Sequence, residues 1–143
     1  MNALDTGIYN LMSGDTGAGG VATLSTGGIF QKPPETATPP YTRFREATDE
    51  LIYAFGNTIQ ADHFFYVMQA WAKDTPNAAS GPITAGAIAD RLRVLFTNPS
   101  LTVTGKTVVS CRVDRSLPPL EEWDSTSQAW WYTRGVIVEA WLA

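Results

Sequence analysis

The sequence predicts an α+β fold, an antiparallel β-sheet with two helices packed on one face and an additional β-hairpin. Three observations support this class. Apolar residues recur at helical spacing near the N-terminus and again over residues 82–97. Residues 106–114 alternate between apolar and polar, which is typical of a strand with one dry face and favours antiparallel pairing. The order helix, three strands, helix, two strands then places the helices together on one face of the sheet.

Length and composition limit the function classes. The 143 residues predict a single domain, 1–143, and 44% hydrophobic residues with five tryptophans predict a large aromatic core or interface. A net charge of −4 argues against DNA binding through a basic face. The single cysteine, Cys111, excludes an internal disulfide and suits a reducing compartment.

Membrane and secretory proteins are not expected either. No apolar run reaches the roughly 20 residues that a membrane helix needs. Asp5 stands where a signal peptide would carry basic residues. We therefore expect a soluble, intracellular product.

The N-terminal elements begin with a helix over residues 2–13. Leu4, Ile8 and Leu11 with Met12 form its buried stripe. The glycine-rich residues 14–20 end the helix and are expected to be a mobile connector. Residues 21–25 then add either one helical turn or a short strand.

Residues 28–46 form the most distinctive stretch of the chain. A short apolar segment, Gly28-Ile29-Phe30, is followed by four prolines and then by a strand over residues 41–46. Prolines fix φ and remove backbone donors, so this stretch is expected to be a stiff, extended arm. Tyr41, Arg43 and Arg45 share one face of the strand, and the arm would present them to a partner.

A hairpin and the longest helix come next. Residues 51–57 and 62–72 are expected to be two strands joined by a turn over 57–61, because the second is rich in aromatic and β-branched residues. Residues 82–97 are expected to be a helix with Ser80 as its cap. Its buried stripe consists of Ile88, Leu92, Leu95 and Phe96.

The C-terminal part contributes two strands separated by a second proline loop, residues 117–124. In the strand over 106–114 the dry face carries Thr107, Val109, Cys111 and Val113. The closing strand, 130–141, is apolar on both sides: Trp130, Tyr132, Val136, Val138 and Ala140 lie on one side, and Trp131, Ile137 and Trp141 on the other. Two explanations remain open, an interface with another molecule or a bulge at Gly135 that turns both sets inward.

No set of residues predicts catalysis, a cofactor or a metal site. The chain contains two Asp-Thr-Gly triplets, beginning at Asp5 and Asp15, and a triplet of this kind forms the active site of aspartic proteases. Here, however, the triplets are expected on a helix and in a glycine-rich loop. His63 beside Asp62 has no evident nucleophile to serve. With one histidine and one cysteine, the chain lacks the ligands of an ordinary zinc site. The acidic residues Glu121, Glu122 and Asp124 are expected to be a solvated loop.

Taken in order, these elements resemble the siphophage tail-completion family, whose members are also described as tail-to-head joining or tail-terminator proteins. The resemblance spans nearly the whole chain. It rests on the helix over 3–13, Gly28-Ile29-Phe30, Pro39-Pro40-Tyr41, the aromatic strand ending at residues 67–72, the helix over 85–96, residues 108–112, and the closing strand 132–141. The glycine loop 14–20 and the hairpin over 51–65 are longer than is typical of that family.

The resemblance implies a non-enzymatic virion protein of a phage tail or neck, assembled in the host cytoplasm. Such proteins form rings, commonly hexamers, that cap the tail tube, end its polymerisation and join it to a head-side connector or adaptor. Genome DNA passes through the lumen without sequence-specific binding, and no membrane is involved. The candidate interface residues of this chain are Tyr41, Arg43, Arg45, Trp130, Trp131, Tyr132 and Trp141.

Two other readings stay open from the sequence. The chain could be a cone-shaped, nuclear-transport-factor-like ligand-binding domain or enzyme, with His63, Tyr66 and Asp62 lining a deep pocket. It could also be a neighbouring neck component, such as a connector adaptor or a tube protein. A pocket around His63 would favour the first of these.

Overall fold

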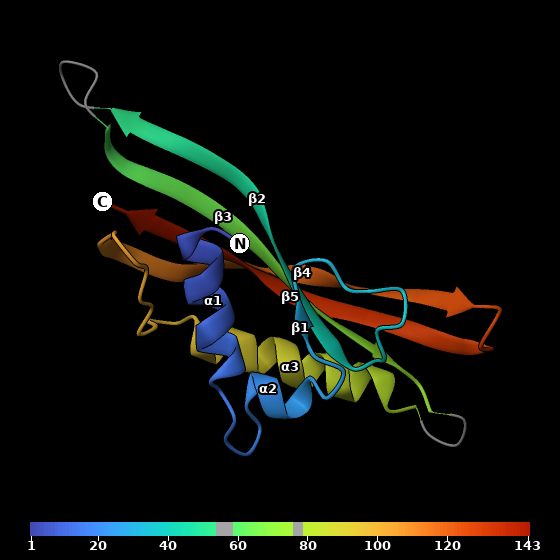
Figure 1. Ribbon diagram of the computed structural model, residues 1–143. Helices are drawn as coiled ribbons and strands as arrows, with labels where there is room; N and C mark the ends of the chain where they lie inside the picture. Colours follow the sequence, from blue (N-terminus) through green and yellow to red (C-terminus); the bar gives the residue numbers. More distant parts are fainter. Residues whose placement is uncertain (54–58, 76–78) are drawn as a thin grey trace.

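The computed structural model describes residues 1–53, 59–75 and 79–143 of the chain (Figure 1). The helices and strands follow one another along the chain in the order α1, α2, β1, β2, β3, α3, β4, β5. The helices are α1 (Ala3–Ser13), α2 (Val21–Leu24) and α3 (Gly81–Leu95). The strands are β1 (Ile29–Phe30), β2 (Tyr41–Tyr53), β3 (Ile59–Lys73), β4 (Val108–Asp124) and β5 (Ala129–Leu142). No helix among these residues is both long and apolar enough to cross a membrane.

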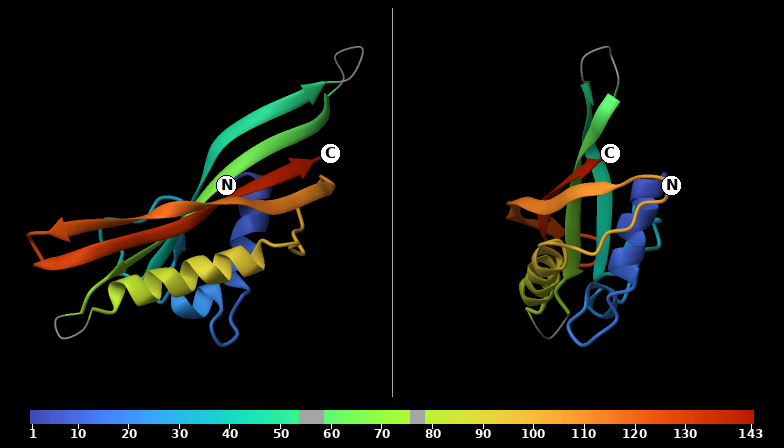
Figure 2. Two further views of the ribbon diagram at one scale, coloured as in Figure 1. Left: turned by 180° about the vertical axis from the view of Figure 1, so that it is seen from behind. Right: turned by 90° about the vertical axis from the view of Figure 1, so that its left-hand side faces the viewer.

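The five strands form one twisted sheet in the order β1-β2-β3-β5-β4. All neighbours pair antiparallel except β1 and β2, which pair in parallel. The α+β class is therefore confirmed, but the sheet is mixed rather than purely antiparallel, and three helices instead of two pack against it. The hairpins β2–β3 and β4–β5 extend from the centre of the molecule in opposite directions (Figure 1, Figure 2).

The two long helices pack on the same face of the sheet and bury a common core. Tyr66 and Met68 of β3 and Val136 of β5 are fully buried in one cluster with Ile88 and Leu92 of α3. The core residues from α1 and the chain after α3 are Leu4, Ile8, Met12, Phe96, Leu101 and Val103. The predicted helical stripes are confirmed, except that Leu11 and Leu95 are only partly buried.

A polar network at the start of α1 connects the helix to the sheet. The side chain of Asn2 accepts a hydrogen bond from the N–H of Asp5, and Asp5 accepts one from the N–H of Asn2, which completes a capping box. The hydroxyl of Tyr66 donates to the other carboxylate oxygen of Asp5 at 2.6 Å. Burial first, and this contact with Asp5 second, raise the pKa of Tyr66 strongly. Asp5 therefore has a structural role.

The start of α3 differs from the prediction. Ser80 is the residue before the helix, as expected, but its side chain makes no capping hydrogen bond. Instead, the carboxylate of Asp74 accepts a hydrogen bond from the N–H of Gly81 at 2.9 Å. The same carboxylate accepts the hydroxyl of Tyr132 at 3.2 Å, which joins the helix start to β5.

The proline-rich stretch is a closed loop, and the prediction of an extended arm is wrong. The N–H of Gly27 donates to the carbonyl of Pro40, and the N–H of Thr42 donates to the carbonyl of Gly28. These bonds hold both ends of the loop side by side, where β1 pairs with the start of β2. A Cβ at Gly27 would lie 1.6 Å from the carbonyl oxygen of Thr38, so only glycine allows this approach. The Pro39–Pro40 peptide bond is cis.

Two strand boundaries were also predicted wrongly. Residues 41–46 and 51–53, which were expected in two separate strands, belong to one strand, β2, with a register shift between Glu46 and Thr48. The rest of the second predicted strand, residues 54–57, lies outside the described residues. The predicted turn over 57–61 lies partly outside the described residues. Likewise, residues 117–124 are no loop, because β4 continues through them to Asp124.

The prolines in β4 are tolerated because β4 is the edge strand of the sheet. Pro118 and Pro119 lie at a register shift between Leu117 and Leu120, where the ladder with β5 is interrupted. Another shift between Val108 and Ser110 breaks the expected alternation, so Val108 packs against the core and Val109 is exposed. Cys111 is buried as expected, and burial raises its pKa to about 12.

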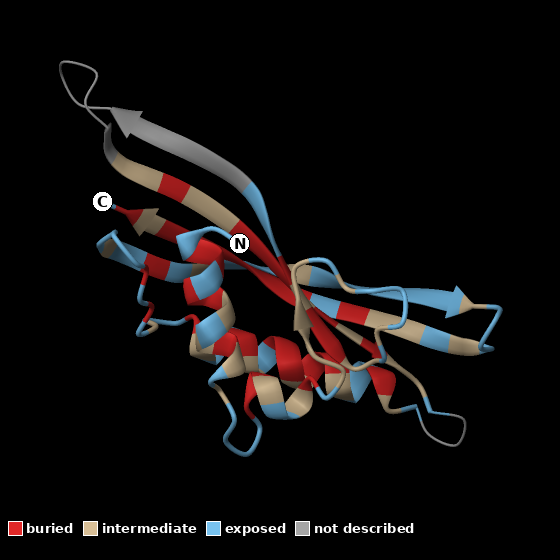
Figure 3. Ribbon diagram, in the orientation of Figure 1, coloured by how far each residue is buried: buried red, intermediate tan, exposed pale blue. Residues whose placement is uncertain are grey.

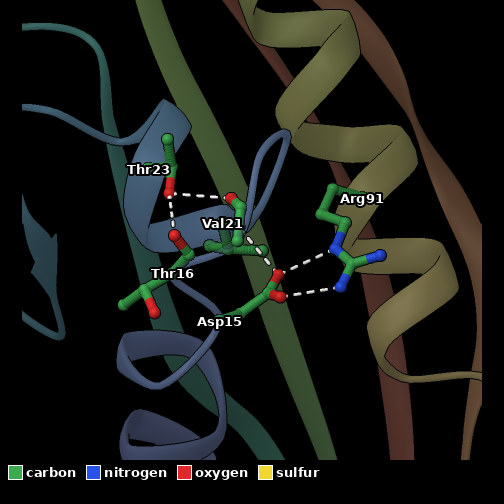
Figure 4. A network of polar contacts seen from close by, with 6 residues as sticks. Asp15, Thr16, Val21, Thr23 and Arg91 are labelled. Carbon is green, nitrogen blue, oxygen red and sulfur yellow. Dashed lines mark hydrogen bonds and ion pairs between the residues drawn. The ribbon is translucent and has the colours of Figure 1, made fainter.

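The glycine-rich loop after α1 is tied to α3 by an ion pair, in contrast to the mobile connector expected from the sequence (Figure 4). The carboxylate of Asp15 accepts two hydrogen bonds from the guanidinium of Arg91, at 2.7 and 2.8 Å. It also accepts the N–H of Val21 at 2.8 Å, and the hydroxyl of Thr23 donates to the carbonyl of Thr16. A bidentate carboxylate–guanidinium pair is a strong, geometrically specific contact.

We expect this ion pair to make stability depend on acidic pH. The hydrogen bond from Arg91 lowers the pKa of Asp15 against the opposing effect of burial. A depressed folded-state pKa gives stability that is complete above the unfolded value of about 3.9 and is lost as the pH falls through the folded value. In urea unfolding, Asp15→Asn should therefore have a lower free energy of unfolding than the wild type at pH 7, and the difference should be smaller at pH 3. Asp90→Asn, at an exposed position of α3, is the control; an equal deficit at both pH values would contradict this role of Asp15.

Candidate assembly interface

The sheet has a second face, opposite the helices, which carries the odd-numbered residues of β3 and β5. We call it the open face. Side chains alternate along a strand, and the core residues of β3 and β5 are all even-numbered. The register runs without a shift from the pair Asp62–Leu142 to the pair Lys73–Trp131. The bulge considered at Gly135 is therefore absent from this ladder, and the two apolar sides of β5 stay on opposite faces.

An aromatic cluster covers one end of the open face. The rings of Tyr41 and Trp71 stack with centroids 6.1 Å apart, and Trp131 meets them edge-on at 6.4 and 6.2 Å. Phe30 of β1 meets Tyr41 edge-on at 6.1 Å. Trp71 and Trp131 are half-buried, and among the described residues the indole N–H of Trp71 has no hydrogen-bond acceptor. We call these four side chains the aromatic cluster.

Charged groups surround the aromatic cluster. The ammonium group of Lys73 lies 5.2 Å from the ring centre of Trp131 and 3.5 Å from the carboxylate of Asp124. Hydrogen bonds from the hydroxyl of Ser127 and then from the indole N–H of Trp131 lower the pKa of Asp124. Glu122 lies directly across the ladder from Trp131 and is exposed. The expected solvated acidic loop is thus part of a strand and its turn.

A cleft of about 310 Å³ opens beside the aromatic cluster. Its lining combines aromatic rings with carboxylates: Tyr41, Trp71, Trp123, Trp131, Glu122 and Asp124. Trp123 pairs edge-on with Trp130 at 5.5 Å, and both stay exposed, at 49% and 41% of their surface. β4 is exposed along most of its length (Figure 3). The outer part of the β4–β5 hairpin carries tryptophans on both faces, because Trp123 and Trp130 face away from Trp131.

A second group, at the opposite end of the open face, is built around a buried carboxylate. The carboxylate of Glu139 accepts a hydrogen bond from Nε of Arg112 at 2.7 Å, and its other oxygen lies 2.8 Å from Nε2 of His63. Burial would raise the pKa of Glu139, but hydrogen bonds from Arg112, His63 and Trp141 outweigh it and lower the pKa. The ring of Trp141 stacks on His63 with centroids 3.9 Å apart.

This arrangement argues against the His63 chemistry considered from the sequence. The neighbouring Asp62 is paired with Lys106 at 3.1 Å, and His63 is buried under Trp141. His63 does not line any of four well-formed clefts among the described residues. The described residues also hold no cluster of three metal-ligating side chains. Another cleft, of about 470 Å³, lies between α1 and the segment after α3 and is lined mainly by small and polar residues.

The structure divides the seven residues predicted for the interface. Tyr41 and Trp131 lie together in the aromatic cluster, and Trp130 lies on the other face of the same hairpin. Trp141 lies at the far end of the open face, stacked on His63. Arg43 donates to the carbonyl of Gln31 at 3.2 Å, and the hydroxyl of Tyr132 donates to Asp74, so both side chains already have partners within the chain. Arg45 is exposed.

Sequence reasoning missed Phe30, Trp71, Lys73 and Glu122 as members of this site. The alternation of β3 would have assigned Trp71 and Lys73 to one face, because they are two residues apart. The pairing of Trp71 with Tyr41 and of Glu122 with Trp131 depends on the strand register, which no local pattern records. Glu122 was also hidden by its assignment to a loop.

Comparisons with known proteins show a likeness in structure. No family model matches the sequence, and no curated protein matches it. Among solved structures, the chain is similar to a chain of the "Virion of native gene transfer agent (GTA) particle". The alignment covers 97% of this chain and 93% of that chain, with a TM-score of 0.57 and 15% sequence identity. At this identity, the likeness shows a common fold.

Proposed function

We propose that this chain is a structural protein of a phage-like virion and acts as a tail terminator. In this role it caps the tail tube, ends its polymerisation and joins the tail to the head-side connector. The observation that carries the proposal is the fold likeness to a virion chain over nearly the full length of both proteins. The tail-terminator role is supported by the resemblance in element order described above.

An oligomeric ring, for which a hexamer is the expected form, is supported by the β4–β5 hairpin. The exposed Trp123 and Trp130 lie on one of its faces and the half-buried Trp131 lies on the other, and aromatic side chains are enriched where proteins meet. In a ring, the same two surfaces meet between every pair of neighbours. One hairpin per subunit is therefore sufficient to form all the contacts between subunits. The acidic composition suits a lumen through which DNA passes, because a basic wall would retain the phosphates.

The partners in this proposal are other copies of the chain, the tail tube protein and a connector or adaptor protein. The protein then resides in the tail or neck of the particle after assembly in the host cytoplasm. We propose no catalytic role, since Asp5, Asp15 and His63 are each engaged in structural contacts.

The proposal is tested by adding the purified protein to polymerising tail tube protein. We expect rings bound at one end of each tube in negative-stain electron micrographs, and shorter tubes than in reactions without the protein. Tubes of unchanged length that carry no added density would contradict the role. Binding to the connector but not to the tube would instead identify a neighbouring neck component.

A further inference from the structure

We propose that the acidic aromatic cleft beside Trp131 receives the guanidinium of an arginine from the next copy of this chain. The inference rests on the proposed ring and names the contact that would join its subunits. It assigns Glu122 and the aromatic cluster as the acceptor, and a row of arginines on the same open face as the donor.

The chemistry of the cleft suits a cation. Aromatic faces attract ammonium and guanidinium groups, and Lys73 already lies in such a position over Trp131. Lys73 also pairs with Asp124, which leaves the second carboxylate, Glu122, exposed at the cleft. A planar guanidinium can stack on an aromatic ring and bind a carboxylate with two N–H groups at once.

The donor lies on the same face, farther from the hairpin turn. The strand register aligns Arg45, Val67, Ile137 and Arg115 in one row across β2, β3, β5 and β4. Arg45 is exposed, and the side chain of Arg115 is 71% exposed, with Asp114 at 3.8 Å. This row offers two arginines beside an apolar centre, which matches the acidic and aromatic character of the cleft.

In the proposed ring this contact is head-to-tail, because the cleft and the arginine row are different surfaces of each copy. The cleft lies at the turn end of β4–β5, whereas the arginine row lies near the middle of the sheet. Joining a cleft on one copy to an arginine on the next leaves a free cleft and a free row at the two ends. Such a head-to-tail interface continues until the ring closes.

Charge reversal at Glu122 tests the contact. We expect Glu122→Lys to weaken self-association, measured by analytical ultracentrifugation, by about ten- to a hundredfold, because a like charge would face the arginine. Asp90→Lys is the matched control: it makes the same charge change at an exposed position of α3, away from the β4–β5 hairpin, and should leave association unchanged. Raising the salt concentration should weaken the wild type more than Glu122→Lys.

The donor is identified by charge swaps. As a single substitution, Arg45→Glu or Arg115→Glu should weaken association. Combined with Glu122→Lys, the substitution at the true donor should restore association. If Glu122→Lys associates like the wild type, or neither swap restores association, the cleft contact is overturned while the ring stands. If the wild type never associates, alone or on tail tubes, both the contact and the ring are overturned. Thermal unfolding of each variant separates lost association from lost folding.

Discussion

Replacing Trp131 with glutamate is expected to abolish self-association while the subunit still folds. Trp131 is half-buried in the aromatic cluster, and its indole N–H reaches Asp124 at 3.3 Å. Buried tryptophans dominate binding energies at interfaces, so we expect association to weaken at least about 100-fold. Because the cluster lies at the end of a hairpin, away from the main core, the free energy of unfolding should fall by only about 1–2 kcal/mol. Light scattering and urea unfolding measure the two effects.

The control for this variant is Val94→Glu. Val94 is an apolar residue on α3 with 61% of its surface exposed, so glutamate there adds the same charge away from the hairpin. It should keep both the association and the stability of the wild type. If Trp131→Glu instead unfolds the protein, Trp131 belongs to the monomer core and this end of the open face is no interface.

The largest effect on folding is expected for Gly135→Ala. Gly135 pairs with Gln69 in the centre of the sheet, and a Cβ there would lie 2.0 Å from the carbonyl oxygen of Met68 and 3.0 Å from Cα of Gln69. Both are backbone atoms of β3, so β3 and β5 would have to separate. Strain of this kind costs about 3 kcal/mol or more, which is a large share of a domain's stability. Urea unfolding should show most of the variant unfolded or far less stable.

Gly17→Ala is the matched control for this substitution. Gly17 lies in the loop after α1, where a Cβ would have no neighbour within 4 Å. Its stability should equal that of the wild type within about 0.5 kcal/mol. A Gly135→Ala protein as stable as this control would mean that β3 and β5 approach each other differently at Met68.

The sequence predicted best where local patterns decide the structure. α1 and α3 follow from apolar residues at helical spacing, and β5 follows from a long run of strand-forming residues. The predicted proline loop over 117–124 was wrong because Pro118 and Pro119 lie on an edge strand, where missing donors cost little. Which strand is at the edge is set by tertiary pairing and leaves no local signal.

The candidate site was predictable in part for the same reason. The alternation within β5 correctly separates Trp130 from Trp131. The contacts that make a site from these residues join β2, β3, β5 and β4, and they depend on register. The loop over 31–40 shows the same limit, since its prolines indicate stiffness but not the hydrogen bonds at Gly27 and Gly28 that bring its ends together.

We propose that the aromatic end of the β4–β5 hairpin joins copies of this chain. The most direct test of this claim is the molar mass of the wild type and of Trp131→Glu, measured by light scattering after chromatography, both free and released from tail tubes. We predict a multiple of the 15.5 kDa subunit for the wild type and 15.5 kDa for Trp131→Glu. A wild type that stays at 15.5 kDa in every condition, or a variant that assembles equally well, would contradict the claim.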